Sequence, residues 1–185
     1  VNPVFIYPIY VLYLLSHGLS FAAIGAIGAI QSVIVVGGEL PTGYVGDRIG
    51  RRNSMALGQA LFTLSAAVLI VGESFPAFAL GFALLSFGWT FVSGSEQAWL
   101  YDTLADRFDE DTYTHVQGRG AAVGQWVMAG TMIVGSFMYV ADPLYPFLAV
   151  LVMGVLAGVV VFPLPKNSLY AEDGAEDGDI SVLQA

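Results

Sequence analysis

Two carboxylates stand inside long apolar stretches of this sequence and are the first candidates for chemistry. Glu39 lies in the stretch 21–45 and Glu96 in the stretch 76–100. A charge at the centre of a bilayer costs about 2.5–3.5 kcal/mol on insertion scales, so such residues usually face a bundle interior or an aqueous cavity. For Glu39 a proton-coupled role and a packing or gating role both stay open. For Glu96 a structural role is favoured.

Other residue types that carry chemistry are sparse. His17 and His115 have no partner at metal-ligand spacing, so we predict no metal site. The sequence contains no phosphate-binding loop of the form G-x-x-x-x-G-K-S/T, which argues against an ATP-driven pump. It also contains no cysteine, and Ser93-Gly94-Ser95 does not form a hydrolase elbow. We therefore expect neither an enzyme nor a resident cofactor.

The composition indicates that lipid is the solvent for much of this chain. Of its 185 residues 56% are hydrophobic and 11% are charged, whereas a soluble domain is usually about a quarter charged. The formal net charge is -9, with acidic residues concentrated at 102–111 and 172–179. So acidic a surface argues against nucleic acid as a partner, and solvated loops are the simplest interpretation. The lipid bilayer is the expected surrounding.

The elements that must position these residues are apolar helices. A helix needs roughly 20 apolar residues to cross the hydrocarbon core. Six stretches approach that length, namely 1–16, 21–45, 54–71, 76–100, 120–140 and 143–164. The sequence therefore predicts an all-α membrane protein with six transmembrane helices. Two glycine pairs, Gly25/Gly28 and Gly120/Gly124, predict close helix packing.

The basic residues predict the direction of these helices. All six (Arg48, Arg51, Arg52, Arg107, Arg119 and Lys166) fall on one side of the predicted bundle. The connections 17–20, 72–74 and 141–142 contain no Lys or Arg. By the positive-inside rule the basic side is cytoplasmic. We expect a multi-pass protein of the cell membrane with both chain ends in the cytoplasm.

A compact charged loop joins the second and third stretches. Residues 43–52 read GYVGDRIGRR, with glycines that permit a tight turn around one acid and several arginines. This string resembles the signature of major facilitator transporters, G-x-x-x-D-R-x-G-R-R/K, in the matching topological position. A purely topogenic basic loop would explain the arginines but not the acid and glycines at this spacing. The resemblance assigns a conformational role to Gly43, Gly46, Asp47, Arg48, Gly50, Arg51 and Arg52.

Three further strings extend the resemblance over essentially the whole chain. They are ELPTG at 39–43, SGSEQAWLYD at 93–102 and GRG at 118–120. The resemblance implies the N-terminal half of a twelve-helix fold, in which residues 1–165 form two inverted three-helix repeats. Residues 166–185 would form an acidic cytoplasmic tail where the family's central loop begins. The second half is absent from this sequence, as in a truncated half-transporter.

The resemblance also implies roles for individual residues. Asp102, at the cytoplasmic end of the fourth helix, would pair with Arg51 as part of a gate, although a merely solvated Asp102 stays open. The first helix lines the central cavity in this family. Tyr7, Tyr10 and Tyr13 are therefore the substrate-facing candidates, with interfacial or packing roles as the alternatives.

These expectations describe a secondary active transporter of a small solute that works by alternating access, with a proton as one candidate coupling ion. Its partner would be a second six-helix half or a second copy of the chain. The alternative is a non-transporting membrane scaffold or regulatory subunit derived from a transporter half. Nothing in the sequence identifies the solute.

Overall fold

The computed structural model describes residues 4–105 and 110–161, and among these it leaves the side chains of 4, 97, 100–105 and 110–113 undescribed. Within these ranges the chain is helical and contains no strand. The elements are η1 (Val4–Ile6), α1 (Tyr10–Ser16), α2 (Phe21–Ile49), α3 (Arg51–Val71), α4 (Phe75–Ala105), α5 (Glu110–Ala141) and α6 (Tyr145–Val161). The predicted tail at 166–185 lies outside the described residues.

Five of the six predicted helices are present, several with longer ends. Among the described residues, four segments are long and apolar enough to cross a membrane: Phe21–Ile49, Arg51–Val71, Phe75–Glu96 and Thr114–Ala141. The apolar helix α6 has 17 residues. With α1 these helices fit a six-helix half. The 29 residues of α2 extend about 44 Å, more than the roughly 30 Å hydrocarbon core, so α2 must reach into at least one interface.

The first predicted helix is not continuous, and this part of the prediction was wrong. A single 3-10 turn at Val4–Ile6 is followed by turn residues 7–9, and α1 has only 7 residues. Pro8 explains the break, because it lacks a backbone N–H and disfavours helical geometry at Tyr7 before it. The chain therefore bends between Tyr7 and Ile9, and the tyrosines of this segment do not share one helix.

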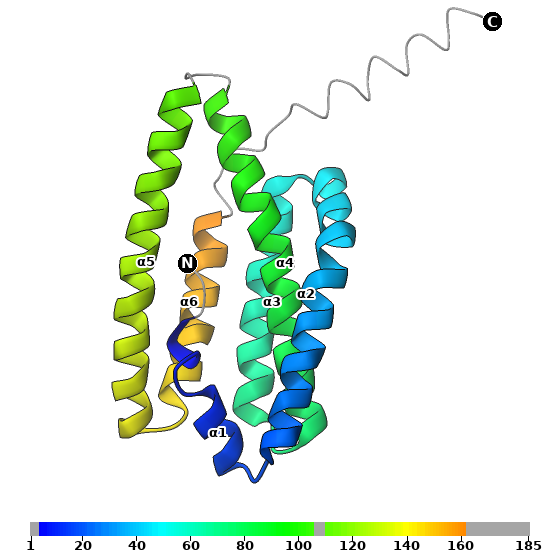
Figure 1. Cartoon of the computed structure of the whole chain (residues 1–185), viewed down its shortest axis with the longest axis vertical. Coiled ribbons are helices and arrows are strands. Elements are labelled where there is room, and N and C mark those ends of the chain that lie inside the picture. Colours follow the sequence, from blue (N-terminus) through cyan, green and yellow to red (C-terminus); the bar gives the residue numbers. More distant parts are fainter. Residues whose placement is uncertain (1–3, 106–109, 162–185) are drawn as a thin grey trace, which may run out of the picture.

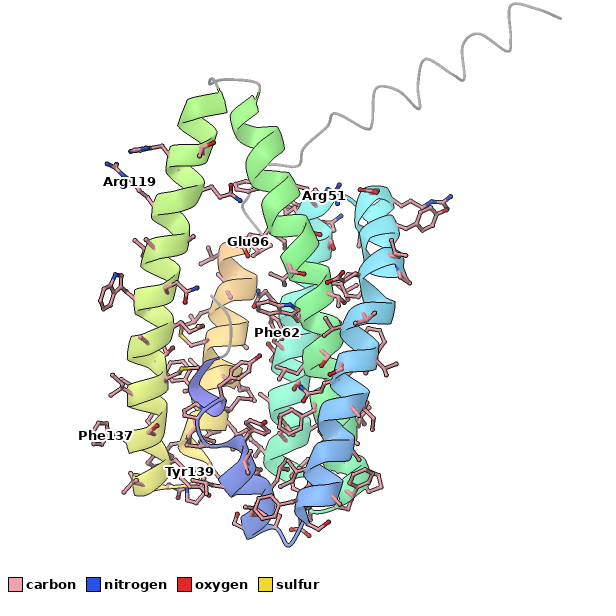
Figure 2. All side chains as sticks on the ribbon, in the orientation of Figure 1. Arg51, Phe62, Glu96, Arg119, Phe137 and Tyr139 are labelled. Atoms are coloured by element: carbon pink, nitrogen blue, oxygen red, sulfur yellow. The ribbon has the colours of Figure 1, made fainter. Side chains whose placement is uncertain are left out.

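The helices run alternately up and down, so their connections separate into two groups (Figure 1). The connections at 17–20, 72–74 and 142–144 lie at one end, and the α2–α3 turn lies at the other. Arg51 and Arg119 lie toward this second end in Figure 2, and Arg48 and Arg52 flank the same turn. Arg107 and Lys166 fall outside the described residues. The four described arginines thus share one end, as the alternation of loops predicts.

The densest packing joins α3 to α4, with α2 against α4 and α6 against α3. Here the backbones meet at glycines: a Cβ at Gly58 would lie 2.5 Å from Val92 Cγ2 and 2.8 Å from the Gly88 carbonyl oxygen. The glycine pairs predicted to pack, Gly25/Gly28 and Gly120/Gly124, have no neighbouring atom within 4 Å of the position that a Cβ would occupy. Within the described structure that prediction was wrong, and close approach occurs at other glycines.

The outer face of the bundle is formed largely by α5. This helix contacts η1 and α6, and it contacts α4 less. Large apolar side chains of α5 remain exposed, including Trp126 at 80% and Phe137 at 73%. Figure 2 shows Phe137 pointing away from the other helices. Such a surface is stable only in an apolar surrounding such as lipid or a partner helix.

Candidate functional site

The charged loop of the sequence is a one-residue reversal between two long helices. The helix α2 ends at Ile49 and α3 begins at Arg51. Gly50, between them, has φ +87°, a left-handed conformation that side chains of L-residues rarely adopt. The loop therefore needs glycine at this position, and the short reversal keeps the last turn of α2 beside the first turn of α3.

Asp47 and Arg51 are joined across this reversal. The Asp47 Oδ1 atom lies 2.6 Å from Arg51 Nη2, with 51% of the aspartate side chain and 18% of the arginine side chain exposed. The buried Nε of Arg51 has no hydrogen-bond partner in the described structure. Asp102 lies in α4, but its side chain is outside the described residues, so the predicted pairing of Arg51 with Asp102 stays a prediction.

The remaining members of the loop have separate positions. The guanidinium carbon of Arg48 lies 4.6 Å from the centre of the Tyr44 ring, a cation–π arrangement. Arg52 is the second residue of α3. Gly43 faces open space, whereas a Cβ at Gly46 would lie 3.2 Å from the Ser54 hydroxyl oxygen. Gly46 thus permits a close approach of α2 to its neighbours.

Two serines beneath this loop tie α3 to α4. The Ser95 hydroxyl donates to the Ser54 hydroxyl at 2.7 Å, and Ser54 donates to the Phe91 carbonyl at 3.1 Å. Both serines are buried, and both would lie within 3.3 Å of a Cβ on Gly46. This contact was not predicted from the sequence. The available signal was the short polar string SGS at the end of the fourth apolar stretch.

Glu39 lines a polar cleft between α2 and α4. The cleft has a volume of about 330 Å³ and is lined by residues from these two helices: Glu39, Thr42, Gly43, Thr90, Ser93, Gly94 and Ser95. The side chain of Glu39 is exposed, and it forms no ion pair with a described residue. Pro41 lies inside α2, which continues as a helix through it.

Glu96 takes a different position from Glu39. It is exposed on α4 and does not line the Glu39 cleft. Figure 2 shows it below Arg51 along the bundle. The two intramembrane acids predicted from the sequence therefore do not form one site.

A larger groove lies further along α2 and α4, and Tyr7 and Phe62 from outside these two helices also line it. It has a volume of about 450 Å³ and combines aromatic, amide and hydroxyl groups without a charged side chain. Its lining is Tyr7, Gly28, Gln31, Ser32, Val35, Val36, Phe62, Leu85, Ser86 and Trp89. A smaller cavity of about 110 Å³ adjoins it, since Tyr7, Gln31 and Leu85 line both. Together they form a continuous concavity that mixes apolar and polar side chains.

The three predicted cavity tyrosines separate in the structure. Tyr7 lines both cavities and is 51% exposed, and Tyr10 lines the smaller one. Tyr13 is 1% exposed, its hydroxyl donates to the Leu69 carbonyl at 2.9 Å, and its ring packs against Phe147. The bend at Pro8 separates Tyr7 from α1, which contains both Tyr10 and Tyr13. Tyr13 therefore has the packing role that the sequence left as an alternative.

Gln31 is a groove residue that was not predicted from the sequence. Its side chain lines both cavities, and among the described residues its amide has no hydrogen-bond partner. The signal was present, because Gln31 and Glu39 are the amide and carboxylate side chains of the stretch 21–45. An unpartnered amide at membrane depth requires water or a ligand, since lipid tails cannot hydrogen-bond it.

Comparison with known proteins shows which family has this arrangement. The family model of the Major Facilitator Superfamily matches residues 4–184, which include every described helix. The chain belongs to the Major Facilitator Superfamily. It is also similar to the uncharacterized MFS-type transporter YxaM of Bacillus subtilis (strain 168), with 27% identity over 154 residues. That alignment covers 80% of this chain and 36% of YxaM.

Membership in the Major Facilitator Superfamily confirms the sequence resemblance and the six-helix fold class. It also confirms that the chain is a multi-pass membrane protein of a transporter family and not an enzyme. The chain spans about a third of the length of the curated relative it matches. The described helices fit a six-helix half of the superfamily fold.

Proposed function

We propose that this chain is the N-terminal half of a secondary active transporter that moves a small solute by alternating access. In this proposal it lies in the cell membrane with its arginine-rich end and both termini on the cytoplasmic side. The observation that carries the proposal is the uncharged polar groove of Tyr7, Gln31, Ser32, Ser86 and Trp89. A solute crossing between two halves needs such a surface.

The chemistry of the groove supports a solute-binding wall. The Ser32 and Ser86 hydroxyls donate to carbonyls of their own helices, at 3.0 Å each, so their oxygens remain as acceptors. The free amide of Gln31 supplies donors beside them. Aromatic faces of Tyr7 and Trp89 complete the lining. This half therefore offers hydrogen bonds and stacking, and any solute charge would be met by the other half or by water.

The exposed surfaces support a partner half. The window of α2 that could cross the membrane is 17% buried, and that of α5 is 6% buried. Because the groove is not enclosed, a second body must close it during transport. A second six-helix half or a second copy of this chain fits that role. A scaffold subunit is not favoured, since scaffolding does not require a free amide at membrane depth.

Transport with and without a second half tests the proposal. Vesicles would contain the chain alone, the chain with a six-helix half encoded beside it or fused behind it, or empty lipid. A panel of labelled small solutes would be offered to each. We expect uptake only with both halves, reduced at least about tenfold by Gln31→Leu and unchanged by Val33→Leu on the exposed face of α2. Uptake by the isolated monomer would contradict the two-half mechanism.

A further inference from the structure

The smaller cavity beside the solute groove is a side pocket with walls of a different kind. It has a volume of about 110 Å³ and is lined by Ile6, Tyr7, Tyr10, Gln31, Phe82 and Leu85. The groove contains two serine hydroxyls, whereas the side pocket contains none. Three of its members are aliphatic or phenyl side chains, and the others are two phenols and one amide. The side pocket is therefore the more apolar part of the concavity.

The apolar walls of the side pocket are held in place by the core of the bundle. Ile6, Phe82 and Leu85 are all buried members of the hydrophobic core. The Tyr10 ring packs edge to face against the Phe82 ring, with 5.8 Å between the ring centroids. Because close-packed side chains of this kind have little freedom to move aside, the walls limit the size of a group that can enter.

The volume of the side pocket indicates which apolar groups it can hold. An engineered apolar cavity of about 150 Å³ in another protein takes up benzene. The side pocket is smaller, at about 110 Å³, so it matches a branched alkyl group or one aromatic ring in close contact. Two fused rings would exceed it. Each methylene group that it removes from water should tighten binding about fourfold.

Tyr7 and Gln31 lie where the side pocket meets the groove, since both line the two cavities. The Gln31 amide offers donors and an acceptor, and it has no hydrogen-bond partner among the described residues. No charged side chain of the described residues lines either cavity. Along α2 the charged residue nearest to Gln31 is Glu39, eight residues or about 12 Å away. An uncharged polar group is therefore the partner that suits this amide.

We propose that the side pocket is a subsite for a compact apolar group of the solute, and that Gln31 binds an uncharged polar group directly beside it. The solute is then a small molecule in which an amide, carbonyl or hydroxyl group adjoins one aromatic ring or branched alkyl group. The groove, of about 450 Å³, accommodates the rest of the molecule. This inference rests on the proposed transport function and adds the substrate class to it.

A series of primary amides tests the subsite through binding alone. Acetamide, isobutyramide, benzamide and 1-naphthamide share the polar group and differ in the apolar one. Saturation-transfer difference NMR would measure their binding to the full chain in lipid nanodiscs, and empty nanodiscs would correct for partitioning into lipid. We expect isobutyramide and benzamide to bind at least about tenfold more tightly than acetamide, because the pocket buries their additional carbons. The larger 1-naphthamide should bind more weakly than benzamide.

Two substitutions change the size of the side pocket at residues that do not line the groove. Phe82→Leu enlarges the pocket and should raise the affinity for 1-naphthamide to that for benzamide or above it. Ile6→Phe fills the pocket and should abolish the preference for benzamide over acetamide. The two changes act in opposite directions, so one of them still tests the subsite if the other variant folds poorly.

Two further variants separate the polar contact from general effects of substitution. Gln31→Leu should weaken benzamide binding about tenfold, because the hydrogen-bonding amide is lost. Val33→Leu, on the exposed face of α2, is the control and should leave all four affinities unchanged.

Equal binding of acetamide and benzamide would overturn the subsite. A size order that neither Phe82→Leu nor Ile6→Phe alters would also overturn it, and so would the absence of binding by every amide. None of these results bears on uptake by vesicles that contain both halves, which tests the proposed transport function separately. Absence of uptake would contradict transport even if the expected size order were observed.

Discussion

Asp47 and Arg51 lie on two different helices yet are joined by an ion pair of 2.6 Å across a single glycine. The acid belongs to the last turn of α2 and the arginine opens α3. Asp47 and Arg51 are four residues apart, the spacing at which two side chains on one helix would be neighbours. Here the chain reverses between them, and the left-handed conformation of Gly50 keeps the two side chains in contact. The pair therefore holds the shape of the turn at the end of the bundle where the arginines gather.

Removing this ion pair should loosen the turn modestly. Asp47→Asn is expected to cost about 0.5–1 kcal/mol, because the aspartate is half exposed and solvent screens the pair. Thermal unfolding at low and high salt would measure the loss, which should shrink as salt is added. Glu73→Gln at the opposite end is the control and should be neutral. An effect of Asp47→Asn that is independent of salt would contradict an electrostatic role.

Gly50→Ala should destabilise the chain more than an alanine elsewhere in the same string. The left-handed backbone at φ +87° costs an L-residue roughly 1–2 kcal/mol. Gly43→Ala is the matched control, since Gly43 is helical with open space around it and should be neutral or slightly stabilising. The free energy of unfolding of both variants in the same detergent checks this. Equal effects would show that the conformation of the turn is not what requires glycine.

Gly58→Ala should disrupt the packing of α3 on α4. The added methyl would meet the Gly88 carbonyl oxygen at 2.8 Å, and a backbone atom cannot move aside without shifting the helix. We expect a loss of about 1–3 kcal/mol, as for overpacked cores. Gly25→Ala on α2 has open space and should show no loss. A stable Gly58→Ala with unchanged midpoint would contradict the helix contact.

Tyr13→Phe should reduce stability, whereas Tyr7→Phe should reduce solute uptake. Loss of the Tyr13 hydroxyl leaves the buried Leu69 carbonyl without its donor and should cost about 1–3 kcal/mol of stability. Tyr7 is half exposed in the groove, so its change should leave stability intact and reduce solute uptake. Thermal unfolding and the uptake assay separate the two effects. A stability loss in Tyr7→Phe without a transport defect would remove it from the proposed wall.

Single-cysteine labelling should show the orientation directly, because the sequence contains no cysteine of its own. Asn53→Cys at the arginine-rich end should react only with a reagent on the cytoplasmic side, and Ser74→Cys only from outside. Both positions are exposed in the described structure. Labelling of both from one side would contradict the placement of these two connections at opposite ends of the bundle.

The helices α2 to α5 and the reversal between α2 and α3 could be predicted from the amino-acid sequence. The length of the apolar stretches and the positions of the arginines can be read directly from the sequence, and they predict the helices and their direction. The glycine at position 50 in the string 43–52 predicts the tight turn between α2 and α3. Glu39 was also noticed this way, since a charge inside an apolar stretch is conspicuous, whereas Tyr7 became a candidate only through the family resemblance. The bend at Pro8 was not predicted, although the residue responsible was visible.

Which residues meet one another could be read only from the packed helices. Gly25 and Gly28 fit the pattern of a packing pair as well as Gly58 does, yet only Gly58 of these three faces another backbone. The Ser54–Ser95 hydrogen bond and the separation of the groove from the Glu39 cleft depend on where α2, α3 and α4 cross. Tyr13 lies in the core and Tyr7 in the groove because the chain bends between them. Local spacing sets the direction of a side chain from its own helix, whereas its partner depends on the placement of the neighbouring helices.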